Sequence, residues 1–468
     1  MSDYKMLING VLVDGECDMA VINPANEEEF ARCPVANERQ LNAAVAAANK
    51  AFPAWSGKTY AQRQACLIAV ADILNANAEE LSTLLTKEQG KPKAQADGEV
   101  MFAEGFCRYF AEQKIESEVR LDAEEQRIEI HHRPLGVVAG IMPWNFPLLI
   151  AVYKLAPALV VGNTIILKPA PTTPLTTLRF GELVADSLPA GVLNILTDEA
   201  ALGPLLTAHS GIAKVSFTGS TPTGKKIMAA SAPTLKRLTL ELGGNDAAIV
   251  LDDVNPKEVA AGIFGAAFIN SGQVCIALKR LYVHDSIYDE LCEEIAILAR
   301  VAKMDDGFAE GAEFGPVQNR AQYEKVCKYV ENARAEGNII AGGHVPDAPG
   351  FFVPLTVVKD ISDGSAVVDD EPFGPVLPIL RCESEIDVIE RANNSAFGLG
   401  GSVWSADEER ARQLGLQLQC GTVWVNQHCA FGPNIPFPPA KESGLGVEWG
   451  DEGLKEFTAM QVVNIKRT

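Results

Sequence analysis

The sequence lacks any apolar run long enough to cross a lipid bilayer, which takes roughly 18 or more consecutive apolar residues. Its first residues, 1–12, also lack the basic segment followed by an apolar segment that marks a secretory signal. Hydrophobic residues still make up 47% of the 468 residues, enough for the cores of two or three domains. We therefore expect a soluble cytoplasmic protein with no membrane partner.

Patterns that hold metals or disulfides are also missing. There are six histidines and ten cysteines, and no two cysteines are spaced as Cys-x-x-Cys. No histidine cluster accompanies them, so we predict no metal site, and a disulfide scaffold is not expected at this length. Most of the cysteines should be small buried side chains. They lie at positions 17, 33, 66, 107, 275, 292, 327, 382, 420 and 429.

Basic residues are outnumbered by acidic ones, and the formal net charge is −21. Such a charge favours solubility, and it argues against nucleic acid as a partner because nucleic acid needs a basic face. It does not argue against a nucleotide cofactor, since local backbone amides hold phosphates whatever the overall charge.

Hydrophobic periodicity predicts a helical first part followed by alternating strands and helices. Helical stripes cover 41–52 and 61–85. Further on, apolar runs that suit buried strands alternate with helix-like stretches such as 176–187, which predicts βαβ units and parallel sheets. The polar stretch 116–132 is expected to form an extended arm. The predicted strands are 137–141, 164–167, 192–196, 215–218, 247–251, 280–283, 376–380 and 422–425.

Ligands of parallel sheets bind beyond the carboxyl ends of the strands, so the turns there contain the first candidate residues. Asn145, in the segment 143–147, has an amide that suits an oxyanion site, but it could equally bond the backbone of a rigid turn. Lys168 follows the next strand, where it could bond a ribose or a phosphate or remain a solvated surface lysine.

Two later turns allow similar alternatives. Gly219 and Ser220 lie between a strand and a predicted helix, the layout of a pyrophosphate site, although the G-x-G-x-x-G spacing is absent. Glu371 and Phe373 could hold a sugar hydroxyl and an adjacent ring, or be turn surface and core plug. The loop 426–437 is too apolar for plain solvent and could line a substrate passage.

Cys275 stands out because glycine, glutamine and small apolar residues surround it in 270–277, while Glu241 begins the glycine-rich segment 241–244. A thiol is intrinsically nucleophilic, and a nearby carboxylate can activate it or a water that later releases a thioester. If these two residues meet, the protein is an enzyme that uses covalent catalysis.

The joint order of these motifs resembles the NAD(P)-dependent aldehyde dehydrogenase superfamily. The resemblance extends from Asn23 to Thr458. It implies an α/β fold with a Rossmann-like cofactor domain, a catalytic α/β domain and a small β-arm through which members form dimers or tetramers. The implied domains are 1–114 with 134–240 for dinucleotide binding, 241–445 for catalysis, and 115–133 with 446–468 for the arm and tail. The motifs are Pro-Trp-Asn-Phe-Pro (143–147), Lys-Pro (168–169), Phe-Thr-Gly-Ser (217–220), Glu-Leu-Gly-Gly (241–244), Gly-Gln-Val-Cys (272–275) and Glu-Pro-Phe-Gly-Pro (371–375).

The resemblance implies a role for each matching residue. Cys275 would be the nucleophile, Asn145 and the backbone N–H of Cys275 the oxyanion hole, and Glu241 the general base. An aldehyde would form a thiohemiacetal, lose hydride to the nicotinamide, and leave as a carboxylic acid after hydrolysis of the thioester. Two alternatives remain on the same fold: transfer of the acyl group to coenzyme A, and a cysteine esterase.

The resemblance also implies the cofactor contacts, with Lys168 and Glu371 on the two riboses. Many NAD-preferring relatives have a carboxylate three residues after the lysine, whereas this chain has Pro171. We therefore expect NAD, with NADP possible. The expected contacts are Ile141, Pro143, Trp144, Lys168, Pro171, Gly219, Ser220, Leu242, Gly243, Glu371 and Phe373.

The same matching implies an apolar, partly aromatic substrate passage without lysine or arginine, which suits an aliphatic or aromatic aldehyde. A second departure lies at 437–441, where Phe-Pro-Pro-Ala-Lys replaces the Phe-Gly-Gly-x-Lys common in relatives and removes backbone donors. The expected passage residues are Phe146, Ile150, Tyr153, Val274, Ile276, Cys429 and Phe431.

Overall fold

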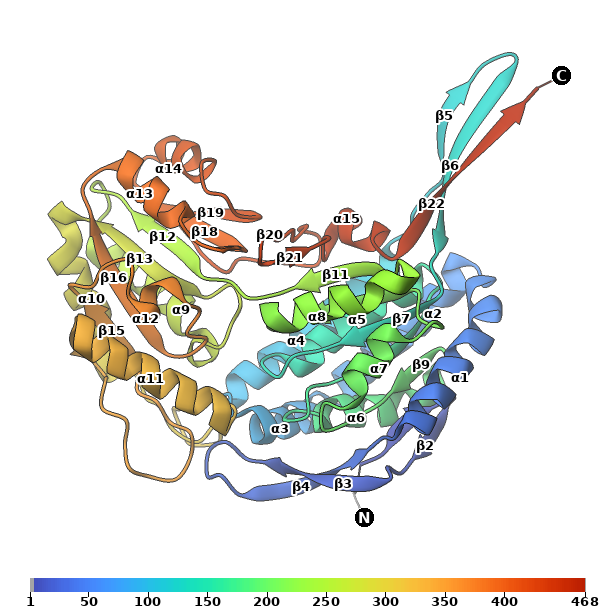
Figure 1. The fold of residues 1–468 in the computed structure, drawn as a ribbon, viewed down its shortest axis with the longest axis horizontal. Helices are drawn as coiled ribbons and strands as arrows, with labels where there is room; N and C mark the ends of the chain where they lie inside the picture. The colour runs from blue at the N-terminus through green and yellow to red at the C-terminus, as the bar shows by residue number, and fades with distance from the viewer. Residues whose placement is uncertain (1–3, 468) are drawn as a thin grey trace.

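The computed structural model describes residues 4–467, which form two lobes and a projecting arm (Figure 1). The first lobe is built on an eight-stranded sheet. In spatial order its strands are β2 (Val11–Val13), β1 (Met6–Ile8), β9 (Leu193–Ile195), β8 (Thr164–Lys168), β7 (Val137–Ile141), β10 (Lys214–Thr218), β11 (Arg237–Glu241) and β21 (Gly444–Leu445). The five strands β9, β8, β7, β10 and β11 run parallel. Their continuous apolar sequences are buried, as expected for strands covered on both faces.

Helices pack on this sheet in two layers. Those of the first lobe are α1 (Glu38–Ser56), α2 (Tyr60–Ala76), α3 (Ala78–Gln89), α4 (Lys93–Glu112), α5 (Pro147–Val160), α6 (Leu175–Val184), α7 (Leu202–Ala208) and α8 (Thr221–Ser231), with short 3-10 turns η1 (Ala185–Ser187) and η2 (Ala232–Thr234). α1, α5 and α6 contact the strands, and α2 and α4 pack on α5. Every residue of α5 is therefore buried, which explains why its sequence is hydrophobic all round.

The second lobe is built on a seven-stranded sheet. In spatial order its strands are β14 (Asn338–Ala341), β15 (Thr356–Lys359), β16 (Val376–Cys382), β13 (Leu278–His284), β12 (Asp246–Val250), β18 (Gly400–Trp404) and β19 (Thr422–Val425), and only β14 pairs antiparallel among these described strands. The accompanying helices are α9 (Pro256–Phe268), η3 (Ile269–Gly272), η4 (Asp285–Ile287), α10 (Tyr288–Val301), α11 (Arg320–Glu336), α12 (Ala366–Asp369), α13 (Glu385–Asn393) and α14 (Glu408–Gly415).

The arm is a three-stranded sheet that extends from the first lobe (Figure 1). It consists of β5 (Glu118–Asp122), β6 (Gln126–Pro134) and β22 (Thr458–Lys466). β22 pairs with β6 over nine residues, from Thr458 opposite Pro134 to Lys466 opposite Gln126. The expected arm at 116–132 is therefore present, and the end of the described chain completes it. The remaining elements are β3 (Cys17–Ile22) paired with β4 (Glu29–Val35), β17 (Phe397–Gly398) paired with β20 (Ala440–Lys441), and α15 (Gly450–Lys455).

All eight predicted strands are present, and the first third is mainly helical, as predicted. Four further strands that were not predicted, β1–β4, lie within 6–35, where β3 alternates between exposed and buried side chains. The helical stripe at 61–85 is divided between α2 and α3. Asn77 separates them with φ −115° and ψ 22°, outside helical geometry, and its side chain donates to the carbonyl of Ile73. Within residues 4–467 no helix is both long and apolar enough to cross a bilayer.

Candidate active site

A pocket of about 410 Å³ collects most of the predicted site residues; we call it the main pocket. Its walls come from the turn that links β7 to α5, from the end of β11, and from the turn before β13. Helix α4 and the segment 429–449 complete it. Cys275, Asn145 and Glu241, which lie up to 130 positions apart in the sequence, all line this pocket.

Cys275 lies in a strained turn, residues 270–276, which we call the nucleophile turn. Asn270, Ser271 and Gly272 have consecutive positive φ angles of 51°, 55° and 72°. A Cβ on Gly272 would lie 2.3 Å from the carbonyl oxygen of Gly374, so only glycine fits there. The Ser271 hydroxyl donates to the carbonyl of Gly315 at 2.7 Å. Strain of this kind persists where the surroundings fix it, often at functional sites.

Burial strongly affects the Cys275 thiol. The thiol pKa is raised to about 12, by burial first and then by the carboxyl groups of Glu241, Glu371 and Asp246, whereas the Lys279 ammonium acts to lower it. The resting side chain is therefore a neutral thiol at pH 7, which must lose its proton to attack a carbonyl.

Asn145 is held directly beside the nucleophile turn. Its side-chain Nδ2 donates to the carbonyl of Gln273 at 2.9 Å, and its backbone carbonyl accepts from Lys91 Nζ at 2.9 Å and from Asn270 Nδ2 at 3.2 Å. An amide nitrogen carries two N–H donors, so one remains for a ligand after the bond to Gln273. The side chain is thus fixed in orientation and retains a donor for an oxyanion.

Glu241 ends β11, and neither of its carboxyl oxygens has a hydrogen-bond partner. Burial raises its pKa well above the usual value, and nearby Glu448 raises it further, while Lys154 lowers it. Lys154 Nζ lies 2.9 Å from Glu448 Oε1 and donates to Ser216 Oγ at 2.8 Å. A buried carboxyl without partners is rare in folded proteins and calls for a functional explanation.

On the cofactor side, the main pocket is lined by eight of the eleven predicted contacts. The rings of Trp144 and Phe373 meet edge to face at 5.3 Å between centroids. Glu371 Oε1 accepts from the N–H of Gly244 at 3.0 Å. The eight are Pro143, Trp144, Gly219, Ser220, Leu242, Gly243, Glu371 and Phe373.

Three predicted contacts, Ile141, Lys168 and Pro171, do not line the main pocket. Lys168 ends β8, and its Nζ lies 2.5 Å from Asp198 Oδ1, in the segment that follows β9. Because β8 and β9 are parallel neighbours, both charges lie beyond the same edge of the sheet. Asp198 was not predicted, since nothing in its own segment marks a site.

The geometry around Gly219 and Gly243 fits a dinucleotide. A Cβ on Gly219 would lie 2.5 Å from the Phe217 ring, and one on Gly243 would lie 2.7 Å from Glu371 Oε2. Helix α8 begins just after Ser220 and has no side-chain cap on its first N–H groups. Free N–H groups at a helix N-terminus, reached through a glycine turn, suit a pyrophosphate.

All seven predicted passage residues line the main pocket, and the wall has further aromatic rings that the sequence did not indicate. Phe431 lies 5.5 Å from Phe102 and 5.5 Å from Trp449 between ring centroids. Phe102 belongs to α4, where it reads as one apolar position of a helix, and Trp449 follows no recognisable motif. The additional wall residues are Phe102, Leu149 and Trp449, together with Phe437 from the loop 426–437 that was expected to line the passage.

His428 lies beside the nucleophile turn rather than in the pocket lining. Its Nε2 is 3.0 Å from the carbonyl of Ile276, its Nδ1 is 2.9 Å from Ser402 Oγ, and its ring packs on Trp424. Burial lowers its pKa to about 3, so the ring is neutral and supports the turn.

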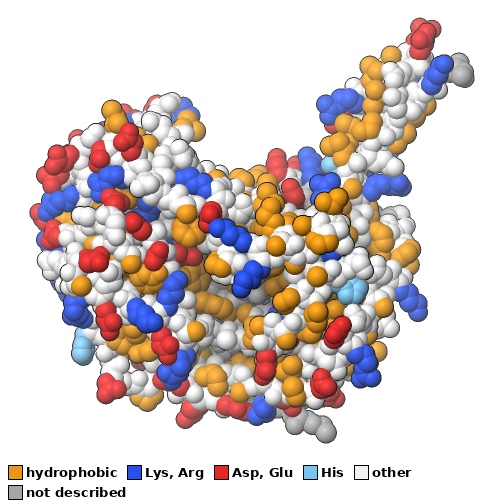
Figure 2. All heavy atoms as spheres, viewed as in Figure 1, with side chains coloured by type: hydrophobic (Ala, Val, Ile, Leu, Met, Phe, Trp, Pro, Cys, Tyr) orange, Lys and Arg blue, Asp and Glu red, His pale blue; other side chains and the backbone are white. Residues whose placement is uncertain are grey.

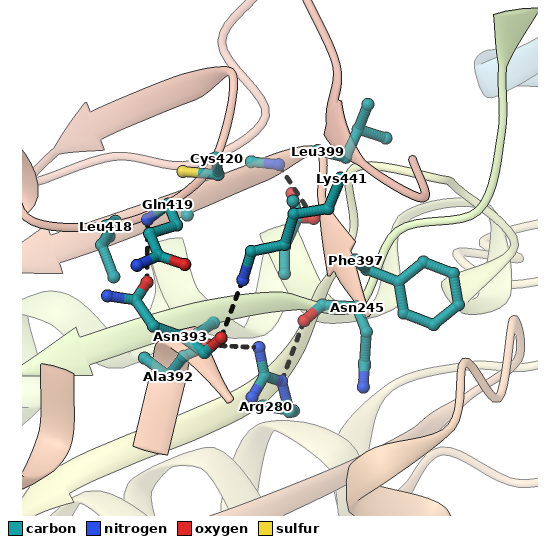
Figure 3. A pocket seen from close by; sticks show the side chains of 15 residues that line it. Asn245, Arg280, Ala392, Asn393, Phe397, Leu399, Leu418, Gln419, Cys420 and Lys441 are labelled. Carbon is teal, nitrogen blue, oxygen red and sulfur yellow. Dashed lines mark hydrogen bonds between the residues drawn. The ribbon is translucent and has the colours of Figure 1, made fainter. Parts of the chain in front are cut away.

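A second, smaller pocket lies in the second lobe, and Figure 3 shows that its two cationic side chains, Arg280 and Lys441, point at backbone carbonyls. Arg280 donates to the carbonyls of Asn245 and Ala392, at 2.9 and 3.0 Å. Lys441 donates to the carbonyl of Asn393 at 2.7 Å, which fixes the end of the proline-containing loop 437–441. These contacts are structural. Among residues 4–467, no group of three or more acidic, histidine or cysteine side chains is arranged to hold a metal.

Comparison with known proteins agrees with this geometry. The model of the aldehyde dehydrogenase family matches residues 12–463. The chain is 39% identical to phenylacetaldehyde dehydrogenase from Pseudomonas fluorescens, over 97% of this chain and 94% of that protein. The NAD+ complex of an aldehyde dehydrogenase from Bacillus cereus superposes with a TM-score of 0.97 at 36% identity, covering 99% of this chain and 97% of that one. An NADP-dependent enzyme from E. coli gives 0.97 at 34%, covering 100% and 98%.

The fold and the matches define an NAD(P)-dependent oxidoreductase that oxidises aldehydes. The chain belongs to the aldehyde dehydrogenase family.

Proposed function

We propose that this protein oxidises an apolar aliphatic or aromatic aldehyde to the carboxylic acid through a thioester on Cys275. The convergence of Cys275, Asn145 and Glu241 on the main pocket is the observation that carries the proposal. The spare N–H of Asn145 and the backbone N–H of Cys275 would form the oxyanion hole, and Glu241 would be the general base.

The proposed chemistry starts at the sulfur. The Cys275 thiol would give its proton to the Glu241 carboxylate, which passes it to solvent, while the sulfur bonds to the aldehyde carbon and the carbonyl electrons move to the oxygen, which Asn145 stabilises. Loss of one such donor typically costs about 2.7–4 kcal/mol in the barrier. NAD, when bound, accepts the hydride that leaves this carbon, so that the carbonyl re-forms as a thioester.

Hydrolysis then falls to Glu241. Burial raises the pKa of this carboxyl well above its usual value, and a raised carboxyl pKa is one way in which enzymes tune a general base. We assign it the proton of the water that attacks the thioester. The carbon–sulfur bond breaks, the acid leaves, and the thiol is regenerated.

We assign the cofactor to the eight pocket contacts and to Lys168, and propose NAD as the preferred form. Although Pro171 removes the carboxylate expected three residues after Lys168, Asp198 supplies one at 2.5 Å from the lysine. The Asp198 carboxylate pairs with Lys168 and offsets its positive charge. It would also repel the 2′-phosphate of NADP. Carboxylates beside the adenosine ribose favour NAD by the same logic in other dinucleotide folds. For Ile141 and Pro171 the proposed role is limited to shaping the turns that follow β7 and β8.

The substrate class follows from the passage wall. The passage residues named above are rings and aliphatic side chains that offer dispersion contacts and carry no cation for a phosphate or carboxylate. The lysine of the main pocket lining, Lys325, lies on the cofactor side, where its Nζ donates to the carbonyl of Glu371 at 2.9 Å. A relative is named for phenylacetaldehyde, an aromatic aldehyde, which agrees with this chemistry.

We also propose the domain division 1–114 with 134–240, 241–445, and 115–133 with 446–468, and a homodimer or homotetramer formed through the arm. The arm strands expose large apolar side chains, and Figure 2 shows them along its length. Such a patch marks a protein interface. Ten cysteines without a disulfide among them suit a reducing compartment such as the cytoplasm. The exposed apolar residues are Val119, Leu121, Met460, Val462 and Ile465.

An aldehyde panel measured with both dinucleotides tests the proposal. We expect reduced cofactor with aliphatic and aromatic aldehydes, faster with NAD than with NADP, and no dependence on coenzyme A. Cys275→Ala should lower turnover by several orders of magnitude while NAD still binds, because only the covalent step is lost. Near-normal oxidation by Cys275→Ala, or a silent panel with the wild-type protein, would contradict it.

A further inference from the structure

Lys279 is a buried cation directly behind the nucleophile. It belongs to β13, four residues after Cys275, and its side chain is only 4% exposed. Its Nζ donates to the carbonyl of Cys275 at 2.6 Å and lies 3.6 Å from Glu371 Oε1. A buried ammonium group is unfavourable unless it is paired and hydrogen-bonded, so these two contacts define where the side chain can lie.

The groups that Lys279 touches are packed against each other. Glu371 Oε1 also accepts from the N–H of Gly244 at 3.0 Å. A Cβ on Gly244 would lie 2.5 Å from the carbonyl oxygen of Cys275, so the two backbones are as close as sterics allow. Three segments that are distant in sequence, 244, 275–279 and 371, therefore meet around one ammonium group.

We propose that Lys279 is a positioning residue that ties the nucleophile turn to Glu371 and electrostatically favours the thiolate of Cys275. The inference rests on the proposed roles of Cys275 as nucleophile and of Glu371 as a contact of the nicotinamide ribose. Through its contacts with the carbonyl of Cys275 and with Glu371 Oε1, Lys279 would hold the nucleophile turn and the Glu371 carboxylate in a fixed relation to each other.

The charges around the thiol support this assignment. Burial is the largest effect and raises the Cys275 pKa, and Glu241, Glu371 and Asp246 also raise it, from β11, the 371–375 loop and β12. Lys279 acts in the opposite direction, from β13. The Cys429 thiol lies on the other side, where its Sγ is 2.9 Å from the carbonyl of Ile276. A neutral residue at 279 would leave the sulfur facing three acidic groups without this compensation.

The test is the pH dependence of Cys275 alkylation together with the affinity for NAD. Wild-type protein, Lys279→Met, Lys279→Gln and Lys279→Arg are treated with iodoacetamide between about pH 6 and 10, below the thiol pKa, where the alkylation rate follows the thiolate fraction. The labelled residue is identified by mass spectrometry. NAD binding is measured separately by fluorescence titration without aldehyde. Lys257→Met, an exposed lysine of α9, is the matched control.

We expect the two neutral variants to be alkylated at Cys275 about tenfold more slowly at pH 8, as for a thiol pKa raised by one unit. They should also bind NAD several-fold more weakly, because Glu371 loses its support. Lys279→Arg should recover much of both properties, and Lys257→Met should match the wild type. A merely structural lysine would change the melting temperature without moving the alkylation profile.

If both neutral variants had the same alkylation profile and the same NAD affinity as the wild type, the inference would be overturned and the proposed function would be left intact. Labelling of a different cysteine in the wild type, with no reduction of NAD by any aldehyde, would instead overturn the proposed function. Two neutral variants of different shape are used because each could disturb packing in its own way, and an effect shared by both reports the charge.

Discussion

Glu99 and Glu241 are two of the buried carboxylates that line the main pocket, and they differ in every contact. Glu99, on α4, accepts from Lys91 Nζ at 2.6 Å and from the N–H groups of Leu148 and Leu149 at 3.0 and 3.2 Å. Glu241, at the end of β11, has no hydrogen-bond partner at either oxygen. Both side chains are almost completely inaccessible to solvent.

The contrast separates a carboxylate that builds the site from one that is available to react. Glu99 caps the first turn of α5 and neutralises Lys91, whose ammonium in turn donates to the carbonyl of Asn145 and lies 3.8 Å from the centroid of the Phe146 ring. Both of its carboxylate oxygens accept hydrogen bonds, one of them from a cation, so its charge is compensated. Glu241 gains nothing from its position in the resting fold, and its desolvation must be offset by stability elsewhere.

The largest expected effect is on turnover, when the unpaired carboxylate Glu241 is replaced. Glu241→Gln keeps the shape and removes the base, so we expect deacylation to slow by about 10²–10⁴-fold. Pre-steady-state measurements should then show a burst of reduced cofactor followed by slow turnover. Chemical denaturation should find the variant at least as stable as the wild type, because no hydrogen bond is lost.

An unchanged steady-state rate without a burst would show that another group activates the water. Glu448, which also lines the pocket and is paired with Lys154 at 2.9 Å, is the next residue to replace in that case.

The same change at the other carboxylate, Glu99→Gln, should mainly lower the stability of the fold. Glu99→Gln leaves Lys91 as a buried charge without its counterion, and breaking such a pair typically costs about 3–5 kcal/mol in the free energy of unfolding. Urea denaturation monitored by tryptophan fluorescence measures it. The double variant Lys91→Met, Glu99→Leu is the control, since an apolar pair of similar volume should regain much of the loss.

If Glu99→Gln were as stable as the wild type but catalytically dead, the distinction between the two carboxylates would be wrong. Glu99 would then belong to the chemistry as well.

Sequence reasoning could predict Glu241 but not Glu99, and the reason is physical. Glu241, Cys275 and Asn145 lie in glycine- or proline-containing turns whose residue types restrict the backbone, so the chemistry is visible locally. Glu99 lies in the middle of a helix, and only the packing of α4 on α5 gives it partners. The same holds for Asp198, whose meaning depends on β8 and β9 being neighbours.

The fold shows the same limit. Buried parallel strands are recognisable as continuous apolar runs, and all eight predicted ones are present. Strands β1–β4 were not predicted because they are short or half exposed. The alternation of apolar and polar side chains that marks a strand then covers too few residues to be recognised. Which apolar residues form the passage wall, such as Phe102 and Trp449, is decided by tertiary contacts alone.

The pH dependence of the free energy of unfolding tests the raised pKa of Glu241 without an activity measurement. The pKa of Glu241 is higher in the folded state than in the unfolded chain. Between these two values the unfolded state is ionised and the folded state still holds its proton, so raising the pH lowers the free energy of unfolding, by up to about 1.4 kcal/mol per pH unit. Below about pH 4 both states are protonated and the contribution is fully present.

The measurement is the difference in unfolding free energy between wild type and Glu241→Gln as a function of pH. We expect the two proteins to be similar at the acidic end and the glutamine variant to become relatively more stable as the pH rises above about 4.5. A constant difference across the range would mean that the Glu241 carboxyl titrates normally.

The smallest expected effect leaves both carboxylates in place and tests the apolar wall between them. Phe431 packs on Phe102 and Trp449, with both centroid separations 5.5 Å, and an aromatic contact of this kind contributes about 0.5–1.5 kcal/mol beyond the area buried. Phe431→Leu should therefore raise KM for an aryl aldehyde by roughly 2–10-fold, with little change for a short aliphatic aldehyde and little change in kcat. The substitution removes a binding contribution that is the same in the ground state and in the transition state. The ratio of kcat/KM for the aryl and the aliphatic aldehyde therefore measures this loss of binding directly. An equal loss for both aldehydes would place the effect on the nucleophile turn, through Cys429 and Ile276, rather than on substrate recognition.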